Sequence, residues 1–469
     1  MLTRITRRPT VASDAINEKR TEFIYWWLLV AIFFEYARPD SFVSGIRVAK
    51  LNSLIPLSLL VVTLFAGGLR PFEQIFANRQ ARWLLAFLCL IVLSVPFADV
   101  SLYSVNIFKA ALGYFFLFLI VARVATSLRR LRGIFATLIV AHLFLMAMTP
   151  AIVLNPQQRT YIAGGTFLGD GNDFALSLCI LLPLAFELAA GTKSRIVAAI
   201  SLGALLAILL AIVGTQSRGA TLGMIAVGGF LWFFSNRKAA SSVVLVLCAL
   251  VVSFHASDAY FTRMSTIKNY QGEGSAEGRI TAWKAGVRMA LHDPLFGVGS
   301  GNFPTAFGSN YRPAGWDGPL MTAHSSYFLV LGELGLPGFI TMLSLVVGGA
   351  VSTMALRRRV LGSSTDPPSE AARDMARMLQ LLTASLIGFG VAGAFLSASY
   401  YPHIFVLSGL LVSAHSIALT GVPVALHPSR PGDRGMRSKL RKAEGSPVRK
   451  ARAGDKETPD VRSPRNRAR

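Results

Sequence analysis

Long apolar runs recur along the chain, separated by short polar segments. The hydrocarbon core of a bilayer is about 30 Å thick, so a helix needs about 20 apolar residues to cross it. The pattern predicts an all-α polytopic membrane protein with about 12 transmembrane helices. The expected spans are 22–37, 51–69, 83–98, 106–122, 132–150, 172–190, 196–214, 219–234, 240–256, 336–356, 379–398 and 403–421.

The polar segments divide the chain into five parts. The longest one between two spans has both turn-rich and helix-like stretches and is too long to be only a connector. The predicted parts are a cytoplasmic N-terminus (1–21), helices one to nine (22–256), a large, partly helical periplasmic loop (257–335), helices ten to twelve (336–421) and a basic, disordered cytoplasmic tail (422–469).

Composition and charge agree with a membrane protein. Of the 469 residues, 53% are hydrophobic and only 15% are charged. The formal net charge of +23 would suggest nucleic acid in a soluble protein. With both termini inside, however, roughly 35 of the 47 Lys and Arg residues fall on the inner side, as the positive-inside rule expects. The charge therefore indicates orientation in the inner membrane and contact with membrane lipids, and nucleic acid is not expected as a partner.

Neither a metal site nor a disulfide framework is predicted. The three cysteines, Cys89, Cys179 and Cys248, all lie in apolar spans, where each behaves as a small hydrophobic residue. The acidic residues of the large loop are scattered and form no D-x-D pair. We therefore expect no cofactor and no catalytic metal.

An arginine follows the seventh apolar span in the segment Val213–Gly219, VGTQSRG. A permanent cation between two apolar helices is costly unless it is paired or hydrated. Arg218 either extends to the outer headgroups or binds phosphate oxygens through its planar guanidinium. The flanking Gly214 and Gly219 allow close backbone approach and favour phosphate binding.

The large loop contains a helix-like run from Ser275 to His292, which Asp293-Pro294 ends. Arg279 and Trp283 are four residues apart and share one face of this helix. Arg279 is either a solvated charge or a ligand-binding cation, and the combination with Trp283 favours the second. The following glycine-rich turn, Gly297–Gly301, lacks the context of a dinucleotide site and is predicted to be a sharp loop.

A histidine precedes the next helical run, in the segment Thr322–Tyr327, TAHSSY. The serines are natural helix caps, so His324 is expected at a helix N-terminus, where the positive end of the dipole disfavours imidazolium. Such a histidine is suited to accept a proton, although a lone histidine is more often structural. Lys109, near the outer end of the fourth span, is either an interfacial residue or an additional phosphate contact.

These motifs resemble the bacterial O-antigen ligase and O-antigen polymerase superfamily in order and placement. The segments that carry the resemblance are Thr215–Gly219, Gly278–Trp283, Pro294–Phe303, His324–Tyr327 and Gly332–Gly338, with a weaker match at Gly169–Ala175. The likeness is specific from about 160 to 345 and only topological elsewhere. The chain also looks like the ligase-like members found in exopolysaccharide and exosortase-associated gene sets.

The resemblance implies a C-type glycosyltransferase that takes a glycan from undecaprenyl diphosphate on the periplasmic side. In ligases the acceptor is the lipid A core of lipopolysaccharide, and in polymerases it is another lipid-linked repeat; glycan and protein acceptors remain open. We expect His324 to activate the acceptor hydroxyl, and Arg218 and Arg279 to bind the diphosphate. A lipid-linked glycan transporter is the alternative of a different class, but neither internal repeats nor midplane charges support it.

Overall fold

The computed structural model describes residues 11–162, 167–265, 274–316, 318–363 and 367–421, and in these residues it is helical without any strand. The all-α prediction is therefore confirmed. The predicted tail, 422–469, lies outside the described residues. The longer helices are α1 (Val11–Ala37), α3 (Leu51–Phe65), α5 (Arg79–Ser94), α6 (Ser101–Val124), α7 (Leu128–Met148), α9 (Gly171–Ala190), α10 (Arg195–Gly214), α11 (Arg218–Phe233), α12 (Lys238–His255), α14 (Gly274–His292), α16 (Ser326–Leu343), α17 (Gly349–Ser363), α18 (Glu370–Gly393) and α19 (Pro402–Gly421).

Short helices connect these elements. They are α2 (Ser44–Val48), α4 (Phe72–Phe76), α8 (Ala151–Leu154), α13 (Asp258–Ser265) and α15 (Phe303–Ala306), with 3-10 turns at Pro39–Ser41 and Val95–Phe97 and π turns at Phe307–Tyr311 and Ser344–Gly348.

Nine helices within the described residues are long and apolar enough to cross a membrane. The chain is thus a multi-pass membrane protein. The predicted spans 51–69 and 219–234 correspond to the shorter apolar helices Ser53–Phe65 and Arg218–Phe233. The predicted first span, 22–37, forms the second half of α1.

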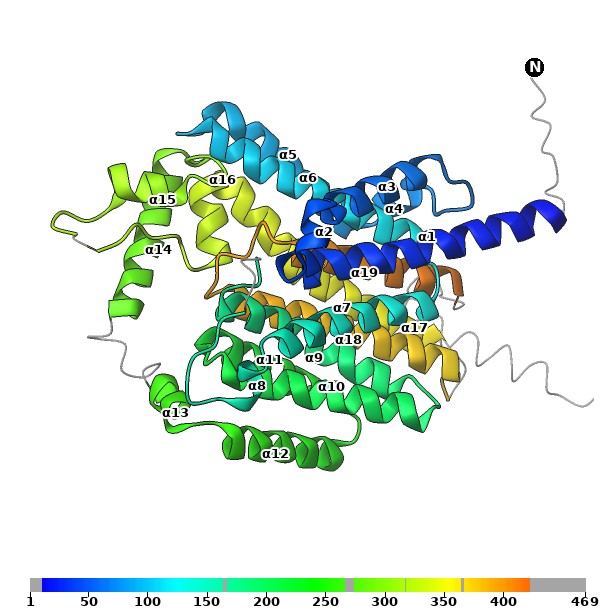
Figure 1. Ribbon diagram of the computed structural model, residues 1–469. Coiled ribbons are helices and arrows are strands. Elements are labelled where there is room, and N and C mark those ends of the chain that lie inside the picture. The colour runs from blue at the N-terminus through cyan, green and yellow to red at the C-terminus, as the bar shows by residue number, and fades with distance from the viewer. Residues whose placement is uncertain (1–10, 163–166, 266–273, 317, 364–366, 422–469) are drawn as a thin grey trace, which may run out of the picture. The chain divides into compact units, whose positions relative to one another are not determined.

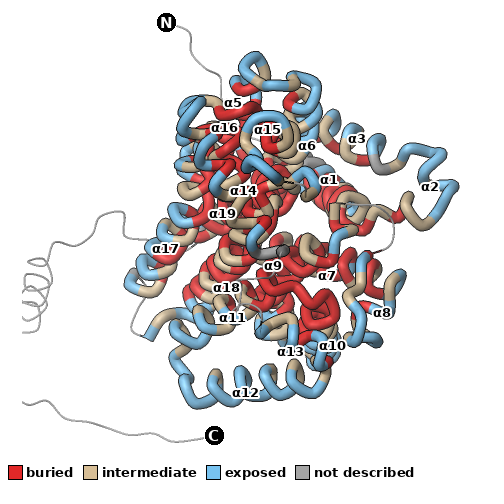
Figure 2. The backbone as a smooth tube through the Cα atoms, turned by 90° about the vertical axis from the view of Figure 1, so that its left-hand side faces the viewer, coloured by how far each residue is buried: buried red, intermediate tan, exposed pale blue. Residues whose placement is uncertain are grey.

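Helices α9 and α18 lie in the centre of the bundle and pack against each other and against α11. Most residues of α9 and α18 are buried, whereas α12 has no buried residue (Figure 2). Small residues allow the close packing of this core. A Cβ on Gly223 of α11 would lie 3.2 Å from both the Ala392 Cβ and the Cys179 Sγ, so larger side chains there would separate the three helices.

One end of the bundle carries α13, α14 and α15, and we call it the loop end (Figure 1). The predicted helix of the large loop is confirmed as α14, which ends before Asp293 and packs along α16. Helix α16 has a kink after Leu334, where Gly335 has φ 63°. A Cβ at Gly335 would approach the Pro294 carbonyl oxygen to 2.3 Å. Glycine at this position therefore allows both the kink in α16 and the close packing of its backbone against Pro294.

The opposite end of α9 holds a buried ion-pair network. Glu187 is fully buried and lies 2.7 Å from Arg132 of α7 and 2.9 Å from Arg377 of α18. Asp374 completes the network, 2.7 Å from Arg132 and in contact with Arg377. Some of the basic residues that we assigned to orientation therefore also join α7, α9 and α18 through paired charges.

Candidate functional site

His324 lies immediately before the capped N-terminus of α16. The Ser325 hydroxyl accepts a hydrogen bond from the Phe328 amide at 3.5 Å, and α16 begins at Ser326. His324 itself has φ 45°, a left-handed conformation that is rare outside glycine and that clusters at functional sites. The expected position of the histidine at a helix N-terminus is confirmed.

The environment of His324 favours the neutral imidazole. Its pKa is lowered mainly by burial and further by the positive charge of Arg279, while the negative charge of Asp170 raises it. The ring is nevertheless only half-buried, so it remains accessible to a reactant. A neutral ring with a free pair of electrons can accept a proton.

Helix α14 brings Arg279 into the neighbourhood of His324. The Trp283 indole Nε1 donates a hydrogen bond to the Ala323 carbonyl oxygen at 3.0 Å. Its ring also stacks on Phe328, with centroids 5.1 Å apart and planes 12° from parallel. Gly286 permits this close packing, because a Cβ there would lie 3.0 Å from the Phe328 carbonyl oxygen. The structure thus brings together three of the predicted site residues, Arg279, Trp283 and His324.

Arg218 is the first residue of α11, and Ser217 caps the helix. The residue is only 9% exposed. The preceding turn is fixed by Gln216, which has φ 51° and donates from Nε2 to the Pro156 carbonyl oxygen at 3.0 Å. Gly214 is required there, since a Cβ would lie 1.8 Å from the Ile152 carbonyl oxygen.

The connection between α18 and α19 contacts both the Arg218 turn and the His324 segment. On one side, a Cβ at Gly219 would lie 3.0 Å from the Phe395 Cβ. On the other side, the Ser326 hydroxyl donates to the Leu396 carbonyl oxygen at 2.7 Å. The hydroxyls of Thr322 and Ser397 lie 3.0 Å apart. Arg218 and His324 therefore belong to segments that pack on the same few residues at the loop end.

Two acidic residues at the start of α9 also belong to this region. Asp170 caps α9, since its side chain accepts a hydrogen bond from the Asn172 amide at 2.9 Å. Asp170 also pairs with Arg159 at 3.1 Å. The Tyr401 hydroxyl lies 3.3 Å from Asp173. Only the weak motif Gly169–Ala175 in the sequence pointed to these acids.

Glu333 is a buried carboxylate that the sequence interpretation left without a role. It accepts hydrogen bonds from the Gly301 and Phe303 amides, at 2.8 and 2.9 Å, and from the Tyr400 hydroxyl at 2.8 Å. It is 1% exposed. An acid inside an apolar helix is itself a signal of a specific role. Here the role is to hold the glycine-rich turn, whose predicted sharpness is confirmed by positive φ at Gly297, Gly299 and Gly301.

The remaining predictions concern Lys109 and metal ions. Lys109 is exposed on α6. Within the described residues, no three His, Cys, Asp or Glu side chains form a group that could hold a metal ion.

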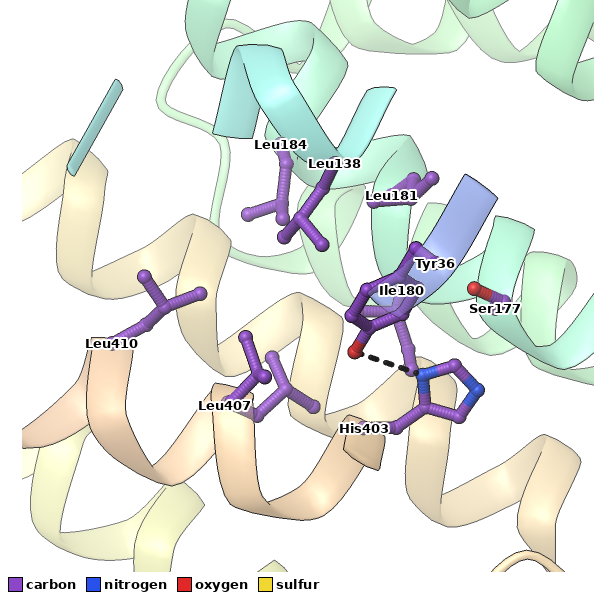
Figure 3. A pocket seen from close by; sticks show the side chains of 10 residues that line it. Tyr36, Leu138, Ser177, Ile180, Leu181, Leu184, His403, Leu407 and Leu410 are labelled. Atoms are coloured by element: carbon purple, nitrogen blue, oxygen red, sulfur yellow. Dashed lines mark hydrogen bonds between the residues drawn. The ribbon is translucent and has the colours of Figure 1, made fainter. Parts of the chain in front are cut away.

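A small cavity lies inside the bundle, lined mostly by Leu, Ile and Val side chains of α7, α9 and α19 (Figure 3). Its polar side is formed by Tyr36, whose hydroxyl lies 3.4 Å from the His403 Nδ1, and by Ser177. Because its walls are otherwise apolar, this cavity offers no group for phosphate binding and is not part of the candidate site.

The fold and the site define a multi-pass membrane protein whose loop end carries arginines and a histidine beside the membrane. Residues 202–343 match the family model described as O-antigen ligase, so this segment is similar to the O-antigen ligase superfamily. The resemblance inferred from the motifs is therefore confirmed. The match supports a function of the O-antigen ligase and polymerase type in general, and this family implies lipid-linked glycans as substrates and glycans as acceptors. Among curated proteins no match was found.

Proposed function

We propose that this protein is a membrane glycosyltransferase that moves a glycan from undecaprenyl diphosphate to an acceptor hydroxyl. The observation that carries the proposal is the packing of α14 on α16, which puts the charge of Arg279 close enough to lower the pKa of His324. All three residues with assigned roles, Arg218, Arg279 and His324, lie in the segment that matches the ligase family model.

The reaction needs a base for the nucleophile and positive charge for the leaving group. His324 accepts the proton of the acceptor hydroxyl while the hydroxyl oxygen bonds to the anomeric carbon. The bond between that carbon and the diphosphate oxygen breaks, and undecaprenyl diphosphate leaves with the electron pair. Arg218 and Arg279 stabilise its growing negative charge, since guanidinium binds phosphate in a bidentate manner and stays charged. A single displacement inverts the anomeric centre.

The proposed location is the bacterial inner membrane, with both termini in the cytoplasm and the loop end facing the periplasm. The distribution of basic residues along the sequence supports this orientation. It places His324 and Arg279 at the outer membrane surface, where a polyisoprenyl chain stays in the bilayer while its diphosphate reaches the arginines.

A transfer assay with purified protein in nanodiscs tests the proposal. The mixture contains the lipid-linked glycan and candidate acceptors, including lipid A core, a second lipid-linked repeat and a protein acceptor. His324→Ala should reduce turnover by about 10²- to 10⁴-fold, the usual contribution of general-base catalysis. The matched control is His292→Ala, since His292 is an exposed histidine of the same loop that contacts Asp293. Wild-type turnover by His324→Ala would disprove the assigned base.

The acceptor class is tested by deletion of the gene and gel analysis of surface glycans. Loss of a ligase should leave long polymer on its lipid carrier. Loss of a polymerase should leave single repeats on the acceptor. An unchanged glycan pattern together with failed transfer in vitro would contradict both activities.

A further inference from the structure

An open groove with a volume of about 690 Å³ lies along α14 at the loop end. It is bordered by one side of α14, by Pro313 and by Phe328 at the start of α16. This volume falls within the range of about 300–1,000 Å³ that is typical of ligand pockets. The mechanism proposed above uses Arg279 and His324 but assigns nothing to this groove.

The groove combines aromatic surface with positive charge. The stacked pair Trp283 and Phe328 supplies apolar ring surface, and Thr281 supplies a hydroxyl. Lys284 and Arg288 lie four residues apart on α14 and therefore line the same side. Among the described residues that line the groove, none is acidic. Such a surface is suited to a ligand with apolar faces, hydroxyl groups and negative charge.

Arg288 is held in place by its surroundings. Its guanidinium donates to the Tyr311 carbonyl oxygen, so the side chain is anchored to the segment before Pro313. A guanidinium fixed in this way loses less conformational entropy when it binds an oxyanion. The exposed Lys284, one turn earlier, offers a second cation.

Trp283 joins the groove to the proposed reaction centre. Its ring lines the groove, while its Nε1 bonds to the Ala323 carbonyl oxygen, one residue before His324. A molecule that presents a hydroxyl to His324 can therefore extend its remaining sugars along α14. The donor diphosphate is assigned to Arg218 and Arg279, so the groove is left for the acceptor.

We propose that this groove binds the acceptor saccharide and selects sugars that carry a phosphate or carboxylate group. The inference rests on the proposed function, because it assigns the groove to the acceptor of that reaction. A headgroup of an anionic lipid would satisfy the cations as well, but it would leave the hydroxyl and the aromatic pair without sugar partners. The test therefore includes such a lipid as a competing ligand.

Binding is measured by calorimetry on the full chain in nanodiscs of phosphatidylcholine, which carries no net charge. The probes are trigalacturonate, glucose 6-phosphate, neutral maltotriose and inorganic phosphate; phosphatidylglycerol is added to the nanodiscs in a separate arm. We expect trigalacturonate or glucose 6-phosphate to bind at least tenfold more tightly than maltotriose and inorganic phosphate. The double variant Lys284→Glu/Arg288→Glu should lose this preference, and Lys284→Arg should keep it.

The control is Arg47→Glu/Lys50→Glu, which changes the net charge equally at two exposed residues in or next to α2. It should bind the charged sugars as wild type does. If the glutamate pair of the groove prevents folding, Lys284→Gln/Arg288→Gln removes the charge without reversing it and should weaken binding in the same direction. Equal binding of neutral and charged sugars, or competition by phosphatidylglycerol alone, would overturn the proposal.

The two proposals fail in different ways. If charged sugars bind in the groove and also bind to His324→Ala, but no acceptor receives a glycan, the groove is correct and the transferase function is wrong. If transfer proceeds and the groove variants keep the wild-type KM for the acceptor, the function is correct and the groove assignment is wrong.

Discussion

The indole Nε1 of Trp283 and the carbonyl oxygen of Ala323 lie 3.0 Å apart and form a hydrogen bond between the loop helix and the residue before His324. This bond fixes α14 to the segment that contains the candidate base, His324, directly before the start of α16. The position of Arg279, one turn before Trp283, therefore depends on the same contact.

Trp283→Phe tests this dependence, because phenylalanine keeps an aromatic ring for stacking on Phe328 but cannot donate the hydrogen bond. The net contribution of one hydrogen bond is about 1 kcal/mol, so we expect kcat to fall about fivefold. The measurement is steady-state transfer. Trp316→Phe is the matched control, since its Nε1 bonds to Pro319 in an exposed turn of the same loop. Equal loss in both variants would argue against the positioning role.

The pH dependence of transfer should report the electrostatic neighbours of His324. The reactive form is neutral, so the rate rises with pH through the pKa of His324, which lies below its ordinary value. Arg279→Gln removes a positive charge, raises that pKa and should shift the acid limb of the profile to higher pH. Asp170→Asn removes a negative charge and should shift the limb to lower pH.

Asp170→Asn is well suited to this test, because asparagine can still cap α9 through its side-chain oxygen. The measurement is the pH profile of kcat at saturating substrate for wild type and both variants. Shifts of the same sign in the two variants would contradict the arrangement of charges around His324.

Arg218→Lys and Arg279→Lys separate charge from geometry. Lysine keeps the positive charge but loses the planar arrangement of donors that binds two phosphate oxygens together. We expect transfer to fall at least about tenfold in each variant. Arg47→Lys, at an exposed position of α2, serves as the control. Full activity in both site variants would reduce the proposed role of the arginines to electrostatics.

Glu333→Gln should destabilise the loop end. A carboxylate accepts all three hydrogen bonds from Gly301, Phe303 and Tyr400, whereas an amide directs an NH₂ group at one of these donors. The expected cost is about 1–3 kcal/mol, measured by chemical denaturation in detergent. Glu73→Gln, on the exposed side of α4, should leave stability unchanged.

The sequence predicted the architecture well because membrane helices follow from length and hydropathy. It also located α14 and the sharp turn after it, since each depends on a local signal such as Pro294 or glycine. His324 was correctly expected at a helix N-terminus, because Ser325 and Ser326 are adjacent in the chain.

Long-range contacts could not be predicted in this way. The carboxyl groups of Asp170 and Glu333 act on residues far away in sequence, and no spacing rule relates Asp170 to His324 or Glu333 to Tyr400. The Arg218 turn and the His324 segment both contact residues 395–399, and these contacts likewise depend on the packing of α18 and α19.

The ion pairs of Glu187 hold α7, α9 and α18 together at the end of α9 that is farthest from Asp170. Separating these helices would leave buried charges without partners, which typically costs several kcal/mol. We therefore expect the helices to stay together at this end, and any opening of the bundle to occur near α14. The lipid carrier would then enter and leave laterally through the periplasmic leaflet, and the substrate would not reach the cytoplasmic face of the protein.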